Sequence, residues 1–546
     1  MKKHSNQSTK TGIFHWIDEH LLLAISLFLL AFIPLYPKWP LFDVLPGYIV
    51  RIRLEDFLIL VAVLIWFVYL LRGKIKLNKI PTFKPVLAYL IVGFLSVLSA
   101  IFITKTVYPE FIQIAKAFLH FFRRIEYFSL FFIFFSAIKD KKHVWFYLGV
   151  LPFVILGVSI YGFGQKYLYW PAYSTMNREF SKGIVLYLTE HARVLSTFGG
   201  HYDLAAYIVL TLPILLVTSF LLKNHLAKIS LWLVSLAEFW LLILTASRTS
   251  FLAYLLAISV MFATLILRKG WVWSLVRWIA IVGLSLFVMV SFGDLSERFA
   301  QVLKLQDLKS SLTSPFKAPP VNGIALDETL PMEQQLAKIA AKSDAPPTPI
   351  NPKERPADVY VEPYGSTKSA EANQGENKEA TAAVVHVDYS ANALKYGLST
   401  GIRLDALWPK AWAGFLRNPL LGSGYSTLVK EKVWEFTQAE STDNDYLRLL
   451  GETGLLGFIT FLLIFTVIIL VLFKAFQKTT DSLLAGLFAA GIGITVGIMM
   501  NALYIDVFEA SKVAYAYWSL SGLLVATACL VLGEKRDNLS RKREKP

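Results

Sequence analysis

Long apolar blocks separated by short polar connections constrain this chain most. A helix that crosses the hydrocarbon core of a membrane needs about 20 mostly apolar residues. Twelve blocks approach that length, and the fourth and seventh need flanking residues to reach it. The sequence therefore predicts an all-α polytopic membrane protein with about twelve transmembrane helices. The blocks are residues 21–36, 54–71, 85–104, 125–138, 144–163, 204–222, 231–244, 251–267, 272–292, 455–473, 483–503 and 513–532.

Composition favours the same class and excludes others. The chain is 55% hydrophobic and 17% charged, whereas a soluble domain carries about 25% charged residues. The net charge of +15 lies mostly in the connections between apolar blocks and at the two ends, so we expect no nucleic-acid partner. The one cysteine, Cys529, lies in an apolar block, which excludes an intrachain disulfide and a cysteine-based metal cluster.

The basic connections predict the orientation of the helices. Lys and Arg are enriched in short cytoplasmic connections, and alternate connections here are basic if the chain crosses the membrane twelve times. We therefore expect both termini in the cytoplasm. Lys105, Lys116, Arg123 and Arg124 are exceptions, because they fall on or near the outer side. The basic groups are Lys2, Lys3 and Lys10, then 72–76, 139–142, 223–228, 268–269 and 474–478, and finally 535–545.

The chain divides into five segments. We expect a cytoplasmic tail at 1–20, nine spans in a membrane domain at 21–292, an outer loop at 293–454, three spans at 455–533 and a basic tail at 534–546. Residues 310–399 of the loop hold few large apolar side chains, which predicts a largely disordered insertion. At 402–417 apolar residues such as Trp408 and Trp412 recur at helical spacing before Asn418-Pro419, which predicts an amphipathic helix on the membrane surface.

Arg248 is the most informative single residue. It lies in a very short predicted outer turn, Thr245-Ala-Ser-Arg248, where arginine is disfavoured. A guanidinium stays charged and binds phosphate oxygens in a bidentate fork, and the start of the following helix favours an anion. The alternative is an arginine that reaches the lipid head groups.

Three further clusters lie on the predicted outer face, at 193–203, 403–424 and 441–454. Arg193 and Arg403 are candidate phosphate ligands, and Asp443 is a candidate general base. Asp443 has an alternative role as a helix N-cap, and His201 is either a base or an interfacial histidine. The polar residues Asp203, Asn444, Tyr446 and Glu452 complete the candidate substrate-binding set. No metal-ligand spacing, P-loop or dinucleotide motif occurs, so we expect no metal and no cofactor.

These clusters resemble the O-antigen ligase family, which belongs to a wider group with O-antigen polymerases and O-oligosaccharyltransferases. The similarity runs from about 161 to 473. It begins at Tyr-Gly-Phe-Gly-Gln, 161–165, and continues through 193–203, the turn ending at Arg248, and Arg403 with Asn-Pro-Leu-Leu-Gly-Ser-Gly at 418–424. Its most specific part is Asn-Asp-Tyr-Leu followed by Glu-x-Gly-Leu-Leu-Gly at 444–457.

The resemblance implies a metal-independent, inverting glycosyltransferase in the bacterial cytoplasmic (inner) membrane, active in lipopolysaccharide or other cell-envelope synthesis. Such an enzyme moves a glycan from an undecaprenyl diphosphate carrier to a lipid or protein acceptor at the outer face. Arg248 and Arg403 match the two arginines that hold the diphosphate. The family histidine that activates the acceptor falls at Asp443. Either Asp443 is the base, or His201 replaces it, or the acceptor differs, or activity is lost.

Other classes stay open at this point. A polysaccharide polymerase of the same superfamily would share these residues. A major-facilitator-like transporter also has twelve spans, but its long central loop lies in the cytoplasm between two similar halves. A non-catalytic protein of cell-surface polymer assembly is consistent with the departure at Asp443.

Overall fold

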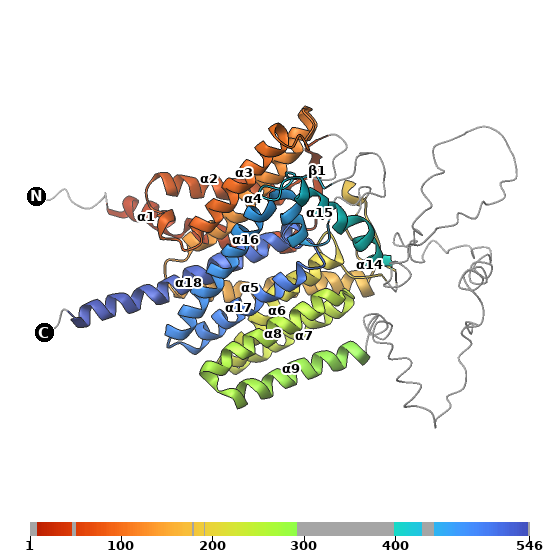
Figure 1. Cartoon of the computed structure of the whole chain (residues 1–546). Helices are drawn as coiled ribbons and strands as arrows, with labels where there is room; N and C mark the ends of the chain where they lie inside the picture. The colour runs from red at the N-terminus through yellow and green to blue at the C-terminus, as the bar shows by residue number, and fades with distance from the viewer. Residues whose placement is uncertain are drawn as a thin grey trace, which may run out of the picture.

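Twelve long helices form the protein, within the residues that the computed structural model describes: 8–45, 51–176, 180–189, 192–291, 398–428 and 442–543. They run up and down beside one another as one bundle (Figure 1). The predicted all-α polytopic membrane fold is confirmed. The helices are α1 (Ser8–Leu35), α2 (Leu54–Leu71), α3 (Phe83–Phe102), α4 (Phe111–Ala137), α5 (Lys142–Tyr167), α6 (His201–Leu221), α7 (His225–Leu244), α8 (Arg248–Lys269), α9 (Trp271–Ser291), α16 (Asp445–Lys478), α17 (Ser482–Asn501) and α18 (Ser511–Arg543).

Eleven of these helices are long and apolar enough to cross a membrane. The exception is α4, which carries Lys116, Arg123, Arg124 and Glu126 in its first two thirds. It nevertheless lies inside the bundle, against α3 and α18. Its last part, from Phe128 to Phe134, is a run of buried side chains that is mostly aromatic, and this is the apolar block that the sequence predicts.

The two ends of the bundle differ. Helices α2, α4, α6, α8, α16 and α18 all begin at one end, which we call the site end because the candidate site lies there. The start of α1 and the end of α18 lie at the other end (Figure 1). A short antiparallel hairpin of β1 (Pro40–Asp43) and β2 (Arg51–Arg53) lies at the site end; the sequence analysis predicted no strand there.

Helices α6 and α17 form the centre of the bundle. In their spans 89% and 83% of the residues are buried. Helix α17 lies close against α8 because of its glycines: a Cβ at Gly493 would lie 2.4 Å from the carbonyl oxygen of Ala257. Small residues at such contacts are typical of helix pairs in membranes. This pairing holds the start of α8 beside the end of α17, both of which belong to the site.

The segment before α16 is helical from Leu398 to Arg417, in the order α14 (Leu398–Ile402), the π-helix η3 (Arg403–Leu407) and α15 (Trp408–Arg417). Trp412 and Leu416 are exposed on α15. The predicted insertion at 310–399 falls outside the described residues, apart from its last two. Short 3₁₀ turns at Leu77–Lys79 and Phe180–Lys182 complete the elements.

Several boundaries differ from the sequence prediction. Helix α16 begins at Asp445, ten residues before the predicted span at 455. Asn444 caps the helix, and Gly454, where the span was expected to begin, is only a kink within it. Helix α1 already begins at Ser8, and α18 continues to Arg543. The tails predicted at 1–20 and 534–546 are therefore partly helical.

Candidate functional site

Arg403 and Asp443 form an ion pair at the site end. Nη2 of Arg403 lies 2.9 Å from Oδ2 of Asp443. Arg403 is buried, donates to the carbonyl oxygen of Tyr504 at 3.3 Å, and lies over that tyrosine ring at 5.7 Å. Asp443 has a φ of +50°, a left-handed conformation that aspartate tolerates better than most residues. Two of the three residues predicted to be catalytic thus lie in contact.

Asn444, rather than Asp443, caps α16. Its Oδ1 accepts a hydrogen bond from the backbone N–H of Leu447 at 2.9 Å, as an N-cap does. The alternative role of Asp443 as the cap is therefore wrong, because its side chain turns toward Arg403 instead. Asn444 was predicted to bind substrate, but its side-chain oxygen accepts this capping hydrogen bond.

Asp506 holds the backbone on both sides of Asp443. Its Oδ1 accepts from the N–H of Asn444 at 2.8 Å, and its Oδ2 accepts from the N–H of Thr442 at 3.0 Å. Nη1 of Arg448 lies 3.0 Å from the same Oδ2. Asp506 belongs to the connection 502–510 between α17 and α18, which the sequence analysis did not single out.

The rest of the connection 502–510 also contacts the site. The carbonyl oxygen of Ala502 accepts from the N–H of Asp445 at 2.9 Å, and the N–H of Phe508 donates to Oδ2 of Asp445 at 3.2 Å. Together with the contact between Tyr504 and Arg403, these bonds hold the connection against Arg403 and against the first residue of α16.

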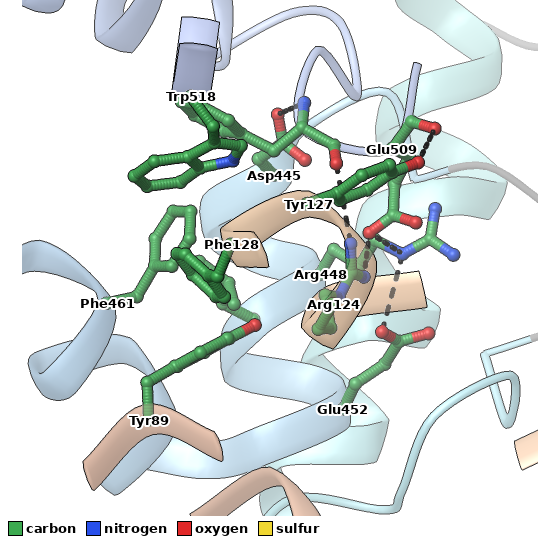
Figure 2. Close-up of a pocket in the computed structure, with 12 residues that line it drawn as sticks. Tyr89, Arg124, Tyr127, Phe128, Asp445, Arg448, Glu452, Phe461, Glu509 and Trp518 are labelled. Carbon is green, nitrogen blue, oxygen red and sulfur yellow. Dashed lines mark hydrogen bonds and ion pairs between the residues drawn. The ribbon is translucent and has the colours of Figure 1, made fainter. Parts of the chain in front are cut away.

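A largely buried charge network includes Glu509 of the connection 502–510. Arg448 lies 3.4 Å from Glu452 and 3.5 Å from Glu509, and Arg124 of α4 forms an ion pair with Glu509. Figure 2 shows the two guanidinium groups facing these carboxylates. Arg124, Arg448 and Glu452 are buried and Glu509 is half-buried. Charges can be buried in this way because each has a counter-charge and hydrogen bonds.

The network lines a small pocket that has an aromatic floor. Tyr89, Phe128, Phe461 and Trp518 lie opposite the charged groups (Figure 2). The pocket has room for about one water molecule. It is too small for a sugar or a diphosphate, so we assign it to the support of the loop rather than to substrate binding.

Glycines let the loop at 418–426 pack against a kink in α16. Gly422 and Gly454 have φ values of +71° and +65°. A Cβ at Gly422 would lie 2.4 Å from the carbonyl carbon of Glu452. At the kink, the N–H of Leu455 donates to the carbonyl oxygen of Pro419 at 2.8 Å. The two glycine-rich motifs therefore form one unit, and Glu452, a predicted substrate-binding residue, is buried within it.

Arg248 is the first residue of α8, at the site end. Its side chain is exposed, and it forms no ion pair with any residue in the described part of the chain. The turn before it has a left-handed residue, Ala246, and Ser247 as the helix cap. Oγ of Ser250 donates to Oδ1 of Asn501 at 3.2 Å, which ties the start of α8 to the end of α17, next to the connection 502–510.

Arg193 and His201 form a pair next to this turn. Nη1 of Arg193 lies 2.7 Å from Nε2 of His201, so that nitrogen accepts and the imidazole is neutral. The N–H of Val194 donates to the carbonyl oxygen of Leu244 at 3.2 Å, close to the turn that carries Arg248. His201 is 2% exposed. Its accepting nitrogen is already occupied, which weakens its case as a general base.

Asp203 and Tyr446 have other neighbours. The charges that act on Asp203 are those of Lys38, Arg53 and Lys512. Burial, and the nearby charge of Arg53, lower the pKa of Lys38 to about 8. Tyr446 donates its hydroxyl to the carbonyl oxygen of Met499 at 2.7 Å. This hydrogen bond uses the proton of the Tyr446 hydroxyl and joins α16 to α17.

Asp506, Arg448 and Glu509 were not among the predicted site residues. Arg448 lies within the motif at 444–457, whereas Asp506 and Glu509 show only a charge close to an apolar block, which does not identify a partner. Arg124 had a clearer signal, because the predicted orientation places it on or near the outer side, where basic residues are disfavoured. Its pair with Glu509 explains that exception, as the contacts of Arg123 with Asp56 and Glu126 at 2.7 Å explain the neighbouring one.

One comparison with known proteins identifies a family. Residues 229–462 match the family model described as O-antigen ligase. The match includes Arg248, Arg403 and Asp443 and ends after the kink at Gly454. No curated protein matches the sequence. Within the described residues, no group of three or more His, Cys, Asp or Glu side chains is arranged to hold a metal ion.

Proposed function

We propose that this chain, whose residues 229–462 belong to the O-antigen ligase family, transfers a glycan from an undecaprenyl diphosphate carrier to an acceptor hydroxyl. Members of the family are membrane glycosyltransferase-like enzymes, and the family match favours this class over a transporter. The reaction takes place at the outer face of a bacterial cytoplasmic membrane, which is the site end of the bundle. The observation that carries the proposal is the pairing of Arg403 with Asp443 there.

The chemistry needs little from the protein. A lipid diphosphate is a good leaving group, so the site must stabilise the charge that develops on it and position the acceptor. Arg248 and Arg403 do the first, because preformed cationic donors in a dry site stabilise developing charge without reorganisation. This role takes the place of a metal ion. A site at the membrane edge also lets the polyprenyl chain stay in the bilayer.

Asp443 positions and activates the acceptor. In the structure its carboxylate lies on the guanidinium that a phosphate oxygen would bind. A diphosphate that binds Arg403 competes with Asp443 for this cation and releases the carboxylate. Asp443 then accepts the proton of the acceptor hydroxyl as the oxygen attacks the anomeric carbon. The bond to the diphosphate breaks in the same single displacement, which inverts the anomeric configuration.

The test is transfer by the purified protein in nanodiscs. Undecaprenyl diphosphate-linked glycan is supplied with candidate lipid and protein acceptors, and release of undecaprenyl diphosphate is measured together with the glycosylated product. We expect both products in the presence of EDTA. A ligase yields one glycan block per acceptor, whereas a polymerase yields longer lipid-linked glycan without an added acceptor. Absence of both products with every acceptor contradicts the proposal.

A further inference from the structure

Asp506 contacts the backbone immediately before and immediately after Asp443. One oxygen accepts from the N–H of Asn444 at 2.8 Å and the other from that of Thr442 at 3.0 Å. Two amides on opposite sides of one residue fix the direction in which that residue's side chain leaves the backbone. At Asp443 this direction is toward Arg403.

The backbone at Asp443 needs such support. Its φ of +50° is unfavourable for a residue with a Cβ, and residues of this kind persist only where the surroundings hold them. Asp506 supplies two charge-assisted hydrogen bonds, which are stronger than neutral ones. The ladder of α16 cannot supply them, because the helix begins only after Asn444.

Asp506 is itself held in place by an arginine. Nη1 of Arg448 lies 3.0 Å from its Oδ2, and Arg448 in turn contacts Glu452 and Glu509. These contacts neutralise a buried carboxylate, as burial requires. Arg448, which lines the pocket of Figure 2, is therefore linked through Asp506 to the backbone on both sides of Asp443.

The same connection also contacts Arg403. Two residues before Asp506, the carbonyl oxygen of Tyr504 accepts from Nη2 of Arg403 at 3.3 Å. One short segment, 504–506, therefore contacts Arg403 directly and the backbone on both sides of Asp443. A displacement of this segment would move the proposed base relative to the proposed phosphate ligand.

From this geometry we infer that Asp506 is a positioning residue that acts through Asp443, an inference that rests on the proposed function of that residue. The variant Asp506→Asn keeps the size of the side chain and one accepting oxygen but puts an NH₂ group against one of the two amides. Turnover should fall by about 10- to 100-fold, because a misplacement of about 1 Å costs about that much. The KM for the donor should change by less than about threefold.

A double-mutant cycle separates positioning from general stabilisation. In the background of Asp443→Asn, Asp506→Asn should lower the remaining turnover by less than about twofold, since the residue that it positions is already gone. Effects that multiply in the double variant would overturn the inference. Asp481→Asn is the matched control: Asp481 also accepts from two backbone amides, at 2.7 and 3.3 Å, but at the other end of the bundle. It should leave turnover unchanged.

A structure of the Asp506→Asn variant by electron cryomicroscopy gives a result that does not depend on turnover. We expect Asp443 to lie beyond about 4 Å, the limit of an ion pair, from Arg403. An unchanged pair overturns the inference even if turnover falls. If the wild-type protein transfers no glycan but the variant loses the pair, the proposed function fails and the structural role of Asp506 stands.

Discussion

Nη2 of Arg403 lies 2.9 Å from Oδ2 of Asp443, so a guanidinium proposed to hold phosphate is already paired with a carboxylate. The pair joins η3 to the residue before the cap of α16. Arg248, by contrast, is exposed and forms no ion pair within the described residues. The two arginines therefore differ in their resting state: one meets the donor directly, and the other must exchange a carboxylate for a phosphate.

This exchange predicts opposite effects of Asp443→Asn on binding and on turnover. Turnover should fall by about 10²- to 10⁴-fold, the usual contribution of a general base. Donor binding should tighten by about fivefold, because Arg403 loses the competing carboxylate of Asp443, in a pair worth about 1 kcal/mol. Microscale thermophoresis with undecaprenyl diphosphate in nanodiscs measures the affinity. Full turnover in this variant would remove Asp443 from the mechanism.

The comparison variant is His201→Ala. His201 accepts from Arg193 and is almost fully buried, so we expect a smaller loss of turnover than in Asp443→Asn and no gain in donor affinity. A large loss confined to His201→Ala would move the base to that histidine.

Arg248→Lys should impair transfer although it keeps the charge. An ammonium cannot present the planar fork that binds two phosphate oxygens. We expect a fall in kcat/KM of about 10-fold or more, equivalent to about 1.4 kcal/mol, in the transfer assay. Arg417→Lys is the control, because Arg417 is an exposed arginine near the same end of the bundle and should tolerate lysine. Equal, normal transfer by both variants would count against bidentate binding.

The orientation of the bundle is tested by cysteine labelling in intact cells. In a Cys529→Ala background, Ser366→Cys lies in the loop predicted to be outside, and Lys76→Cys lies at the end of the bundle where α1 starts and α18 ends. A membrane-impermeant maleimide should label the first in intact cells and the second only after permeabilisation. The reverse pattern would place the site end in the cytoplasm and exclude the proposed location.

Apolar patterning predicted the bundle well, because a membrane span needs one long apolar block and no long-range information. The block at 54–71 coincides with α2. The prediction was weakest where a polar helix end extends beyond the apolar block. Helix α16 begins ten residues early because Asn444 caps it and Gly454 allows a kink, and neither feature alters hydropathy.

The candidate site was only partly predictable for a related reason. Arg248, Arg403 and Asp443 lie in motifs that can be recognised along the chain, whereas Asp506 has no motif and acts only through two backbone amides brought to it by folding. The charge rule did indicate Arg123 and Arg124 as exceptions. It could not indicate that Asp56 and Glu509, from two other segments of the chain, would meet them.

The last prediction concerns how the two glycine-rich motifs fit together. Gly422 and Gly73 have nearly the same φ, +71° and +69°, but a Cβ at Gly422 would lie 2.4 Å from the carbonyl carbon of Glu452, whereas a Cβ at Gly73 meets nothing within 4 Å. Alanine at Gly73 should therefore cost only the left-handed strain, about 1 kcal/mol. Alanine at Gly422 should cost that amount and also separate the loop at 418–426 from the kink at Gly454. The apparent Tm in detergent should fall several degrees further for Gly422→Ala, with loss of transfer. An equal fall in both variants would mean that the close contact with Glu452 contributes nothing to holding the site together.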